Sequence, residues 1–398
     1  MESNIHEHTI ITDSDALVGF CGRLSKTPFI TVDTEFMRES TFWAQLCLIQ
    51  MAGPDEAAII DPLAAGLDLD PFYRLMADEG VLKVFHAARQ DIEIFVKQAG
   101  AVPRPLFDTQ IAAMVCGYGD QVSYDQLVSR IAGQQIDKTS RFTDWSRRPL
   151  NAKQIAYAIA DVTHLRDVYL SLAAQLAEQG RTEWVAEEMA VLSDPRTYRT
   201  EPEEAWQRLK MRVKKPRQLA ILQALAAWRE REAQERDVPR GRVLKDDALY
   251  EVALQQPRDA EALGRLRAIP RGFERSSLAR GILGAVEEAF ALAESALPRV
   301  PRQRPVSEHA GAAAELLKVL LKMVAEDHAV AARVIANADD LEAIAADDRA
   351  DVQALKGWRR QLFGEQALAL KRGELALSMS PRGVVAVALE APERIAAE

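Results

Sequence analysis

The chain has 398 residues, of which 48% are hydrophobic and 27% are charged, and this is the composition of an ordinary globular protein with room for two or three domains. It contains no uninterrupted apolar run of about 18 residues, and its N-terminus, MESNIHEHTI, lacks the basic start and apolar stretch of a signal peptide. We therefore expect a cytoplasmic protein that does not act at a membrane.

The formal net charge of −9 is unevenly distributed along the chain. Residues 1–204 carry 18 basic and 31 acidic groups (−13), residues 205–300 carry 19 and 13 (+6), and residues 301–398 carry 13 and 15 (−2). The basic middle segment favours a nucleic-acid partner, although surface helices of ordinary proteins are also often rich in Lys and Arg. The three cysteines lack C-x-x-C spacing and have apolar neighbours, so we expect buried free thiols.

Strand-like apolar runs alternate with amphipathic segments in the first 110 residues, which indicates an α/β domain. One helix is predicted at RQDIEIFVKQAG (89–100). The predicted strands are FITVDTEF (29–36), QLCLIQMA (45–52), AAIIDPL (57–63), LKVFHAA (82–88) and PLFDT (105–109). After about residue 110 we expect the strands to stop, because the remainder is rich in Ala, Leu, Glu and Arg with helical spacing.

Two breaks divide the chain. SDPRTYRTEPEE (193–204) and LPRVPRQRPVSE (297–308) are rich in proline and polar residues, and the second is predicted to be a linker. We predict an α/β domain over residues 1–200 and two all-α units over residues 208–296 and 309–392, a common size for small domains.

Asp33 and Glu35 end the first predicted strand, in the segment FITVDTEFMRE. Residues i and i+2 of a strand project to the same face, so these carboxylates stand side by side and repel each other. Mg²⁺ or Mn²⁺ would compensate this repulsion, because such hard cations prefer carboxylate oxygens. For a D-x-E pair taken alone, the alternative is a solvated strand end with two surface acids.

Three further residues extend the acidic pair. Asp91 lies in the first turn of the helix predicted at 89–100, where an acid also simply favours the helix dipole. Tyr157 and Asp161, in NAKQIAYAIADVTHL, are four residues apart and share one face of a predicted helix, opposite an apolar stripe. A helical tyrosine is often a half-buried packing residue, so none of these positions identifies a site alone.

Together these segments resemble a known set of motifs. DTE on a strand, an Asp about 55 residues later in a helix, and YAIAD in a later helix resemble the three exonuclease motifs of the DEDD superfamily, in its tyrosine-bearing branch. The neighbouring segments VDTEFMRESTFWAQLCLIQ, HAARQD, LFDTQIAA and DKTSRFTDWSRRPL are similar to the ribonuclease D family. This resemblance covers about residues 8–190 and implies a ribonuclease H-like mixed-sheet exonuclease domain.

The helical regions carry a second resemblance. The segment from LAILQALAAWRE to RGILGAVEEA, within 208–296, resembles the helicase-and-ribonuclease-D C-terminal (HRDC) domain, a small helical bundle that binds nucleic acid. Residues 309–392 look like a degenerate second copy, and ribonuclease D proteins can carry two such domains.

The resemblance implies a catalytic site. Asp33, Glu35, Asp91 and Asp161 would hold two divalent ions, Mg²⁺ or Mn²⁺, with Asp33 bridging them. By the same resemblance, Glu35 and Asp161 complete the first ion and Asp91 supports the second. Tyr157 would orient the attacking water, and hydrolysis would release nucleoside 5′-monophosphates from a 3′ end.

Substrate contacts are also expected. Phe36 and Met37 are placed to contact the terminal nucleotide, although Phe36 is equally suited to core packing. His86 is expected to hydrogen-bond the substrate or to satisfy a core donor. Lys138, Trp145 and Arg148, in DKTSRFTDWSRRPL, are expected to position phosphate, although Trp145 and the RPL turn (148–150) are alternatively structural anchors.

The implied substrate is RNA with a 3′ hydroxyl, such as a tRNA precursor or another structured small RNA, and the implied enzyme is a monomer. Two alternatives stay open at this point. A 3′–5′ DNA exonuclease would use identical metal chemistry, because carboxylates do not sense the 2′ hydroxyl. The other is a non-catalytic protein that binds RNA through its helical domains.

Overall fold

The computed structural model describes residues 9–199, 201–210, 213–300, 308–381 and 383–389. A mixed six-stranded sheet with the strand order β1-β4-β3-β2-β5-β6 organises the N-terminal part. Its strands are β1 (Thr9–Ile11), β2 (Phe29–Met37), β3 (Gln45–Ala52), β4 (Ala57–Ile60), β5 (Leu82–Phe85) and β6 (Leu106–Asp108). Neighbouring pairs among β2, β3 and β4 are antiparallel, whereas β5 runs parallel to β2. Strands β2 to β6 lie where the sequence predicts strands, and β1 is an addition.

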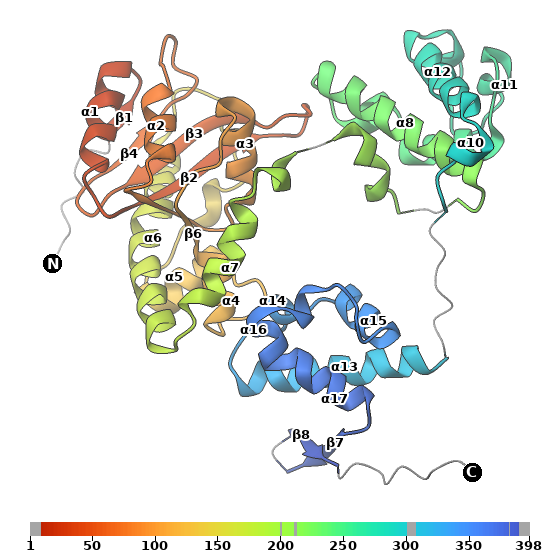
Figure 1. Cartoon of the computed structure of the whole chain (residues 1–398). Helices are drawn as coiled ribbons and strands as arrows, with labels where there is room; N and C mark the ends of the chain where they lie inside the picture. Colours follow the sequence, from red (N-terminus) through yellow and green to blue (C-terminus); the bar gives the residue numbers. More distant parts are fainter. Residues whose placement is uncertain (1–8, 200, 211–212, 301–307, 382, 390–398) are drawn as a thin grey trace.

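Helices cover both faces of this sheet, which explains why β2 and β3 are almost continuous apolar runs. Figure 1 shows α1 (Ser14–Leu24), α2 (Asp70–Ala77) and α3 (Arg89–Ala99) on one side and the long α6 (Ala152–Glu178) on the other. Phe72 and Phe95 are buried and meet edge to face, with ring centroids 5.2 Å apart. The N-terminal α/β domain therefore has a conventional three-layer core.

Helix α6 is fixed at its start and along its length. Asn151 caps it, and a capping box with Gln154 satisfies the first backbone donors. The Thr31 hydroxyl of β2 donates a 2.7 Å hydrogen bond to the Val162 carbonyl, which ties the helix to the strand that carries the acid pair. The same domain also contains α4 (Thr109–Val115), α5 (Tyr124–Ala132), the 3₁₀ turn η1 (Lys138–Ser140) and α7 (Thr182–Leu192).

The segment after residue 200 forms a helical unit with its own core, as the sequence predicts. Leu225, Leu249, Leu263 and Ile282 are fully buried within it. Its elements are η2 (Pro195–Tyr198) and η3 (Pro202–Arg208), which lead into it, then α8 (Pro216–Glu235), α9 (Arg240–Val243), α10 (Asp246–Gln255), α11 (Ala260–Gly264), η4 (Phe273–Arg275), α12 (Ser277–Ala291) and η5 (Glu294–Ala296). Most of the linker predicted at 297–308 lies outside the described residues. None of the described helices has the length and apolar character needed to cross a membrane.

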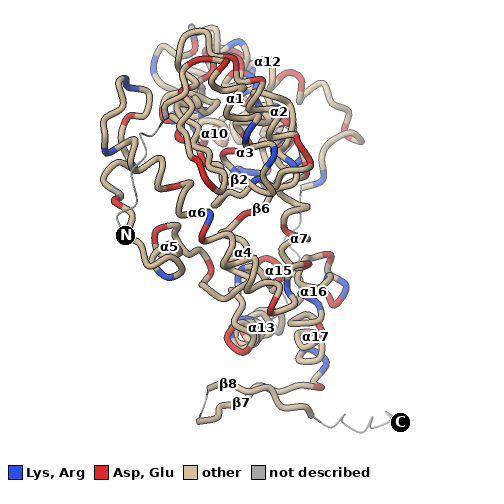
Figure 2. Tube along the Cα trace, turned by 90° about the vertical axis from the view of Figure 1, so that its left-hand side faces the viewer, with Lys and Arg blue, Asp and Glu red and all other residues tan. Residues whose placement is uncertain are grey.

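The last part of the chain is helical with one exception. Its elements are α13 (Glu308–Asp327), α14 (Ala332–Ile335), α15 (Ala338–Ala346), η6 (Gln353–Leu355), α16 (Gly357–Arg359), a π turn (Arg360–Gly364), α17 (Glu365–Lys371), β7 (Leu375–Ser380) and β8 (Gly383–Ala388). The expectation that strands stop after about residue 110 is wrong for β7 and β8, which pair antiparallel. Alternating small and branched side chains favour strands there, and Figure 2 shows that the hairpin strands carry no charged residue.

This C-terminal helical unit packs against the N-terminal α/β domain. The rings of Trp184 on α7 and Trp358 on α16 stack in parallel, with centroids 4.3 Å apart. The Ala331 N–H donates to the Met114 carbonyl at 2.8 Å. Gly117 has a left-handed φ of +84°, and a Cβ there would lie 2.4 Å from the Ala329 carbonyl oxygen, so only glycine permits this close approach.

We expect Trp358→Ala to destabilise the whole chain by about 3–5 kcal/mol, because it removes a buried ring that joins two units. Thermal or urea unfolding would measure the loss. Leu316→Ala on α13 is the matched control, since Leu316 is 49% exposed and its truncation should leave stability almost unchanged. If Trp358→Ala lowers stability no more than Leu316→Ala does, the stacked tryptophans contribute nothing to the stability of the fold.

Candidate active site

A cavity of about 660 Å³ opens at the edge of the α/β domain where β2, α3, α5 and α6 meet. Its lining includes every acid that the sequence predicts for the site. Among the lining residues are Asp33, Glu35, Phe36, His86, Asp91, Tyr124, Arg141, Phe142, Tyr157 and Asp161. Four elements far apart in the sequence thus bring their polar side chains to one hollow.

Three carboxylates form the centre of the site. Asp33, Glu35 and Asp161 each offer an oxygen, and these three atoms lie within 4.8 Å of one another. Asp33 and Glu35 share a face of β2, as the strand period requires, and a bulge in the β2–β3 register follows Glu35. Three hard oxygen ligands so close together are a suitable donor set for a divalent cation.

Asp91 lies next to this group. It is the third residue of α3 and is buried, with 7% of its surface exposed. The Thr34 hydroxyl, on the strand between the two acids, donates a short hydrogen bond to its carboxylate. The charge of Asp33 also acts on Asp91, so all four predicted acids belong to one electrostatic cluster.

Burial and mutual repulsion make these carboxylates hard to ionise. Burial raises the pKa of Asp33 to about 6. Burial, followed by the neighbouring charges of Asp33 and Asp161, raises the pKa of Glu35 far above its usual range. Arg141 brings a positive charge that opposes this rise in pKa at both Glu35 and Asp161. A divalent cation therefore fits here, because it would supply the positive charge that the surrounding side chains provide only in part.

Tyr157 stands beside the acids with its proton in place. The Asp161 carboxylate, one turn further along α6, interacts with its hydroxyl. Burial, and then the charges of Asp161 and Glu35, raise the pKa of Tyr157 above its usual range. The neutral phenol is thus the form present at neutral pH, and it acts as a hydrogen-bond donor rather than a base.

Only some of the other predicted residues line the cavity. Phe36 and His86 line the cavity, and His86 Nδ1 lies 3.0 Å from the Thr109 hydroxyl. Met37 packs with Trp145 in a small apolar cluster, and the described cavity lining does not include it. Lys138 is in the turn η1, but its side chain lies outside the described residues.

Arg148 is engaged by the protein itself. Its guanidinium makes two hydrogen bonds of 2.6 and 2.7 Å to the Asp61 carboxylate. It also donates to the backbone carbonyls of Cys47 and Trp145, both at 2.7 Å. These contacts favour the anchoring alternative over the expected contact with phosphate, and Arg148 is not among the residues that line the cavity in the described structure.

Several lining residues were not predicted, and two of them are neighbours in one loop. Arg141 and Phe142 follow η1, and the Arg141 guanidinium lies 5.3 Å from the centre of the Phe142 ring. Phe142 is 91% exposed, which is unusual for a large apolar side chain. The segment DKTSRFTDW carries only a weak signal, an Arg-Phe pair among basic and polar residues, and only the folded loop brings the pair to the cavity.

The fold and the acidic cavity define a class of enzyme. A family model described as "3'-5' exonuclease" matches residues 8–177, and a model of the HRDC domain matches residues 218–285. Proteins with similar sequences identify the family within this class. A ribonuclease D of Nitrobacter hamburgensis is 56% identical over 378 residues, which cover 95% of this chain and 99% of the relative, and a ribonuclease D of Bartonella henselae is 47% identical over 372 residues, covering 93% and 92%.

The crystal structure of Escherichia coli RNase D, described as an exoribonuclease involved in structured RNA processing, superposes with a TM-score of 0.82 at 31% identity, covering 92% of this chain and 99% of that one. The chain belongs to the ribonuclease D family. The predicted family, the mixed-sheet fold and the HRDC domain are thereby confirmed. The exact domain boundaries and the roles of individual site residues stay predictions.

Metal binding and pH should act together on stability. Because the folded chain raises the pKa of Asp33, it holds that proton more readily than the unfolded chain, and ionisation costs stability as the pH rises from about 4 towards the folded pKa. We expect Asp33→Asn to raise the Tm of the metal-free protein by a few degrees, more at about pH 8 than at about pH 5. Scanning calorimetry in EDTA would measure this difference.

The same samples with Mn²⁺ provide the control. Wild-type Tm should rise with Mn²⁺, and more strongly at the higher pH, because the metal binds ionised carboxylates. Asp33→Asn should lose most of that rise. A metal-free variant that is less stable than the wild type at the higher pH would argue against uncompensated charge in the cavity.

Proposed function

We propose that this protein is a metal-dependent 3′–5′ exoribonuclease that hydrolyses the terminal phosphodiester of RNA and releases nucleoside 5′-monophosphates. The observation that carries the proposal is the cluster of Asp33, Glu35 and Asp161 within 4.8 Å, with Asp91 and Tyr157 beside it. Membership of the ribonuclease D family supports RNA as the substrate.

The four acids are proposed to hold two divalent ions, Mg²⁺ or Mn²⁺. When bound, such ions supply Lewis-acid stabilisation and a more acidic bound water. Asp33, central in the cluster, suits a position shared by both ions, whereas Asp91 is set apart and oriented by Thr34. Tyr157, which lines the same cavity, is proposed to orient the attacking water through its hydroxyl group.

Residues at the cavity mouth are proposed to hold the terminal nucleotide. Phe142 offers an exposed ring on which a base can stack, and Arg141 brings a positive charge towards the scissile phosphate. Phe36 and His86 are proposed to contact the same nucleotide from the floor of the cavity. The predicted roles of Met37, Lys138 and Arg148 find less support, because other contacts occupy the first and third of these residues.

The natural substrate is proposed to be a tRNA precursor or another structured RNA with a 3′ hydroxyl, degraded by a monomer. The similarity to E. coli RNase D, which is described as involved in structured RNA processing, supports this choice. The cytoplasmic location expected from the sequence stays a prediction. DNA remains the alternative substrate, since the acids do not distinguish the sugars.

A labelled-end assay tests the function. RNA carrying a 5′ label and a 3′ hydroxyl should give a ladder that shortens from the 3′ end with Mg²⁺ or Mn²⁺ and not with EDTA. The same sequence as DNA should be cleaved much more slowly. Equal rates on both would favour the DNA exonuclease, and RNA binding without any metal-dependent product would favour a non-catalytic protein.

A further inference from the structure

A second, basic pocket lies where the nuclease domain meets the first helical unit. Its volume is about 230 Å³, and its lining contains five arginines: Arg38, Arg89, Arg199, Arg208 and Arg240. The carboxylates that face them are Glu93 in the lining and Glu230, which is buried beneath Arg208 and Arg240. Five guanidinium groups against two carboxylates leave a net charge of +3 in a small hollow.

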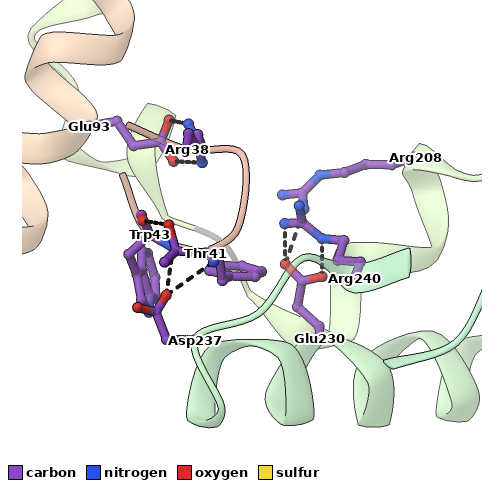
Figure 3. A network of polar contacts seen from close by, with 9 residues as sticks. Arg38, Thr41, Trp43, Glu93, Arg208, Glu230, Asp237 and Arg240 are labelled. Atoms are coloured by element: carbon purple, nitrogen blue, oxygen red, sulfur yellow. Dashed lines mark hydrogen bonds and ion pairs between the residues drawn. The ribbon is translucent and has the colours of Figure 1, made fainter. Parts of the chain in front are cut away.

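Contacts between the two domains build this pocket. Asp237, just after α8, accepts hydrogen bonds from the backbone N–H groups of Phe42 and Trp43 at 3.0 and 2.9 Å (Figure 3). Phe42 is buried, and the Arg240 guanidinium lies 4.5 Å from the centre of its ring. The loop between β2 and β3 is thus held against the helical unit, so the arginines from both sides keep a fixed spacing.

The arginines differ in how far they are already neutralised. Arg38 makes a bidentate pair with Glu93, at 3.0 and 2.7 Å. Arg240 makes two 2.5 Å bonds to Glu230, and Arg208 makes one longer bond of 3.3 Å to the same carboxylate (Figure 3). These three residues therefore have a structural role, although Arg208 remains half exposed.

Arg89 and Arg199 are different. Both are exposed, and the structure gives neither of them a carboxylate partner within the described ranges. Arg89 begins α3, where the helix N-terminus adds further positive potential. Two unneutralised guanidinium groups facing a concave, positively charged surface fit an oxyanion with several acceptor oxygens, such as a phosphodiester.

The pocket also lies close to the catalytic cavity along the chain. Arg38 follows directly after β2, three residues beyond Glu35. Arg89 is followed by Gln90 and Asp91, both of which line the catalytic cavity. The end of β2 and the start of α3 therefore contribute to both hollows.

We infer that the arginine pocket binds a backbone phosphate of the RNA strand whose 3′ end occupies the catalytic cavity. This inference rests on the proposed exoribonuclease function. The pocket would hold a phosphate some nucleotides upstream of the scissile bond, and it would require the first helical unit, because Arg208 and Arg240 close one side of it. Substrates too short to reach it would be cleaved without its help.

The test uses the full chain and two double variants of equal charge. Arg89→Gln/Arg199→Gln removes the two unpaired arginines. Arg333→Gln/Arg349→Gln is the matched control, since both residues are exposed in the C-terminal helical unit and, within the described part of the chain, their hydrogen bonds to carboxylates come from the backbone N–H and not from the guanidinium. Binding of a labelled single-stranded RNA is measured in EDTA by fluorescence anisotropy at several salt concentrations.

We expect the Kd of the pocket variant to rise about tenfold, because it loses charged hydrogen bonds to the RNA. The Kd of the control variant should stay within about twofold of the wild-type value. The slope of log K against log salt should fall by about 0.7 for each phosphate that the variant no longer binds. With metal, the rate on a dinucleotide should be unchanged in both variants, whereas the rate on the longer strand at low concentration should fall only in the pocket variant.

Each outcome separates the two proposals. If the wild type gives no metal-dependent product from either RNA, the proposed function fails. If the wild type cleaves both and the pocket variant matches the control in Kd and salt slope, the pocket is only an interdomain ion-pair network and the inference is overturned. A pocket variant that loses activity on the dinucleotide as well would also overturn it, because the arginines would then act on the catalytic cavity.

Discussion

Asp33→Asn is expected to reduce turnover by several orders of magnitude while the chain remains folded. Asp33 belongs to the group of three carboxylates within 4.8 Å, and its charge also acts on Asp91. The substitution converts the carboxylate into a neutral carboxamide and so removes a negative ligand from the cluster. Every ion held there would therefore bind more weakly. Single-turnover cleavage of labelled RNA at saturating Mn²⁺ measures the effect on the chemical step.

A surface acid of the same domain provides the comparison. Asp55→Asn removes the same charge from an exposed position, and its turnover should equal that of the wild type. Circular dichroism should show that both variants are folded. Asp33→Asn relieves repulsion between buried charges, and Asp55→Asn changes only an exposed side chain. If Asp33→Asn retains more than about a tenth of wild-type turnover, the assignment of this carboxylate to the metals is wrong.

The strands of the nuclease domain were predictable because their signals are local. β2 and β3 are apolar runs of β-branched and aromatic residues, and the structure finds them at 29–37 and 45–52. β1 was missed because three residues, Thr9–Ile11, are too few to show a period. The hairpin β7–β8 was missed because the Ala and Leu residues of β7 also fit the helical spacing of the preceding segments, although the valines of β8 favour a strand.

The acids of the site were predictable for a different reason. Asp33 and Glu35 are conspicuous where they stand, since two carboxylates at the end of a buried strand repel each other. The sequence around Arg141 and Phe142 shows no such repulsion, and only the path of the loop after η1 brings these residues to the cavity. For Arg148 the local sequence was misleading. It lies in a segment expected to bind phosphate, but its guanidinium pairs with the carboxylate of Asp61, 87 residues away.

The arginine pocket is the clearest case of information that is absent from local sequence. Its arginines lie just after β2 and η2 and within α3, η3 and α9, and most of these segments are not unusually basic alone. The charge count identified residues 205–300 as net positive, but Arg38 and Arg89 belong to the segment with the most negative net charge. Only docking of the β2–β3 loop against Asp237 assembles the positive potential.

Tyr157→Phe should lower turnover about 10²-fold or more and leave RNA affinity almost unchanged. The substitution removes one hydroxyl from a ring that keeps its packing against Trp145, with ring centroids 6.1 Å apart. Because the raised pKa of Tyr157 keeps its proton in place, the loss would be that of a positioned hydrogen-bond donor, which is within the usual range for such groups. The Asp161 carboxylate loses its interaction with the hydroxyl, so metal affinity must be measured in parallel.

A second tyrosine on the same helix makes this prediction decisive. Tyr169→Phe, three turns further along α6, removes a hydroxyl from a ring that packs against Phe29 and Phe107 outside the catalytic cavity, and it should leave turnover unchanged. Saturating Mn²⁺ excludes weakened metal binding as the cause of any loss in Tyr157→Phe. A large rise in Kd for RNA with unchanged single-turnover rate would make Tyr157 a substrate-binding residue, because an interaction lost equally in ground state and transition state changes binding and not the chemical step.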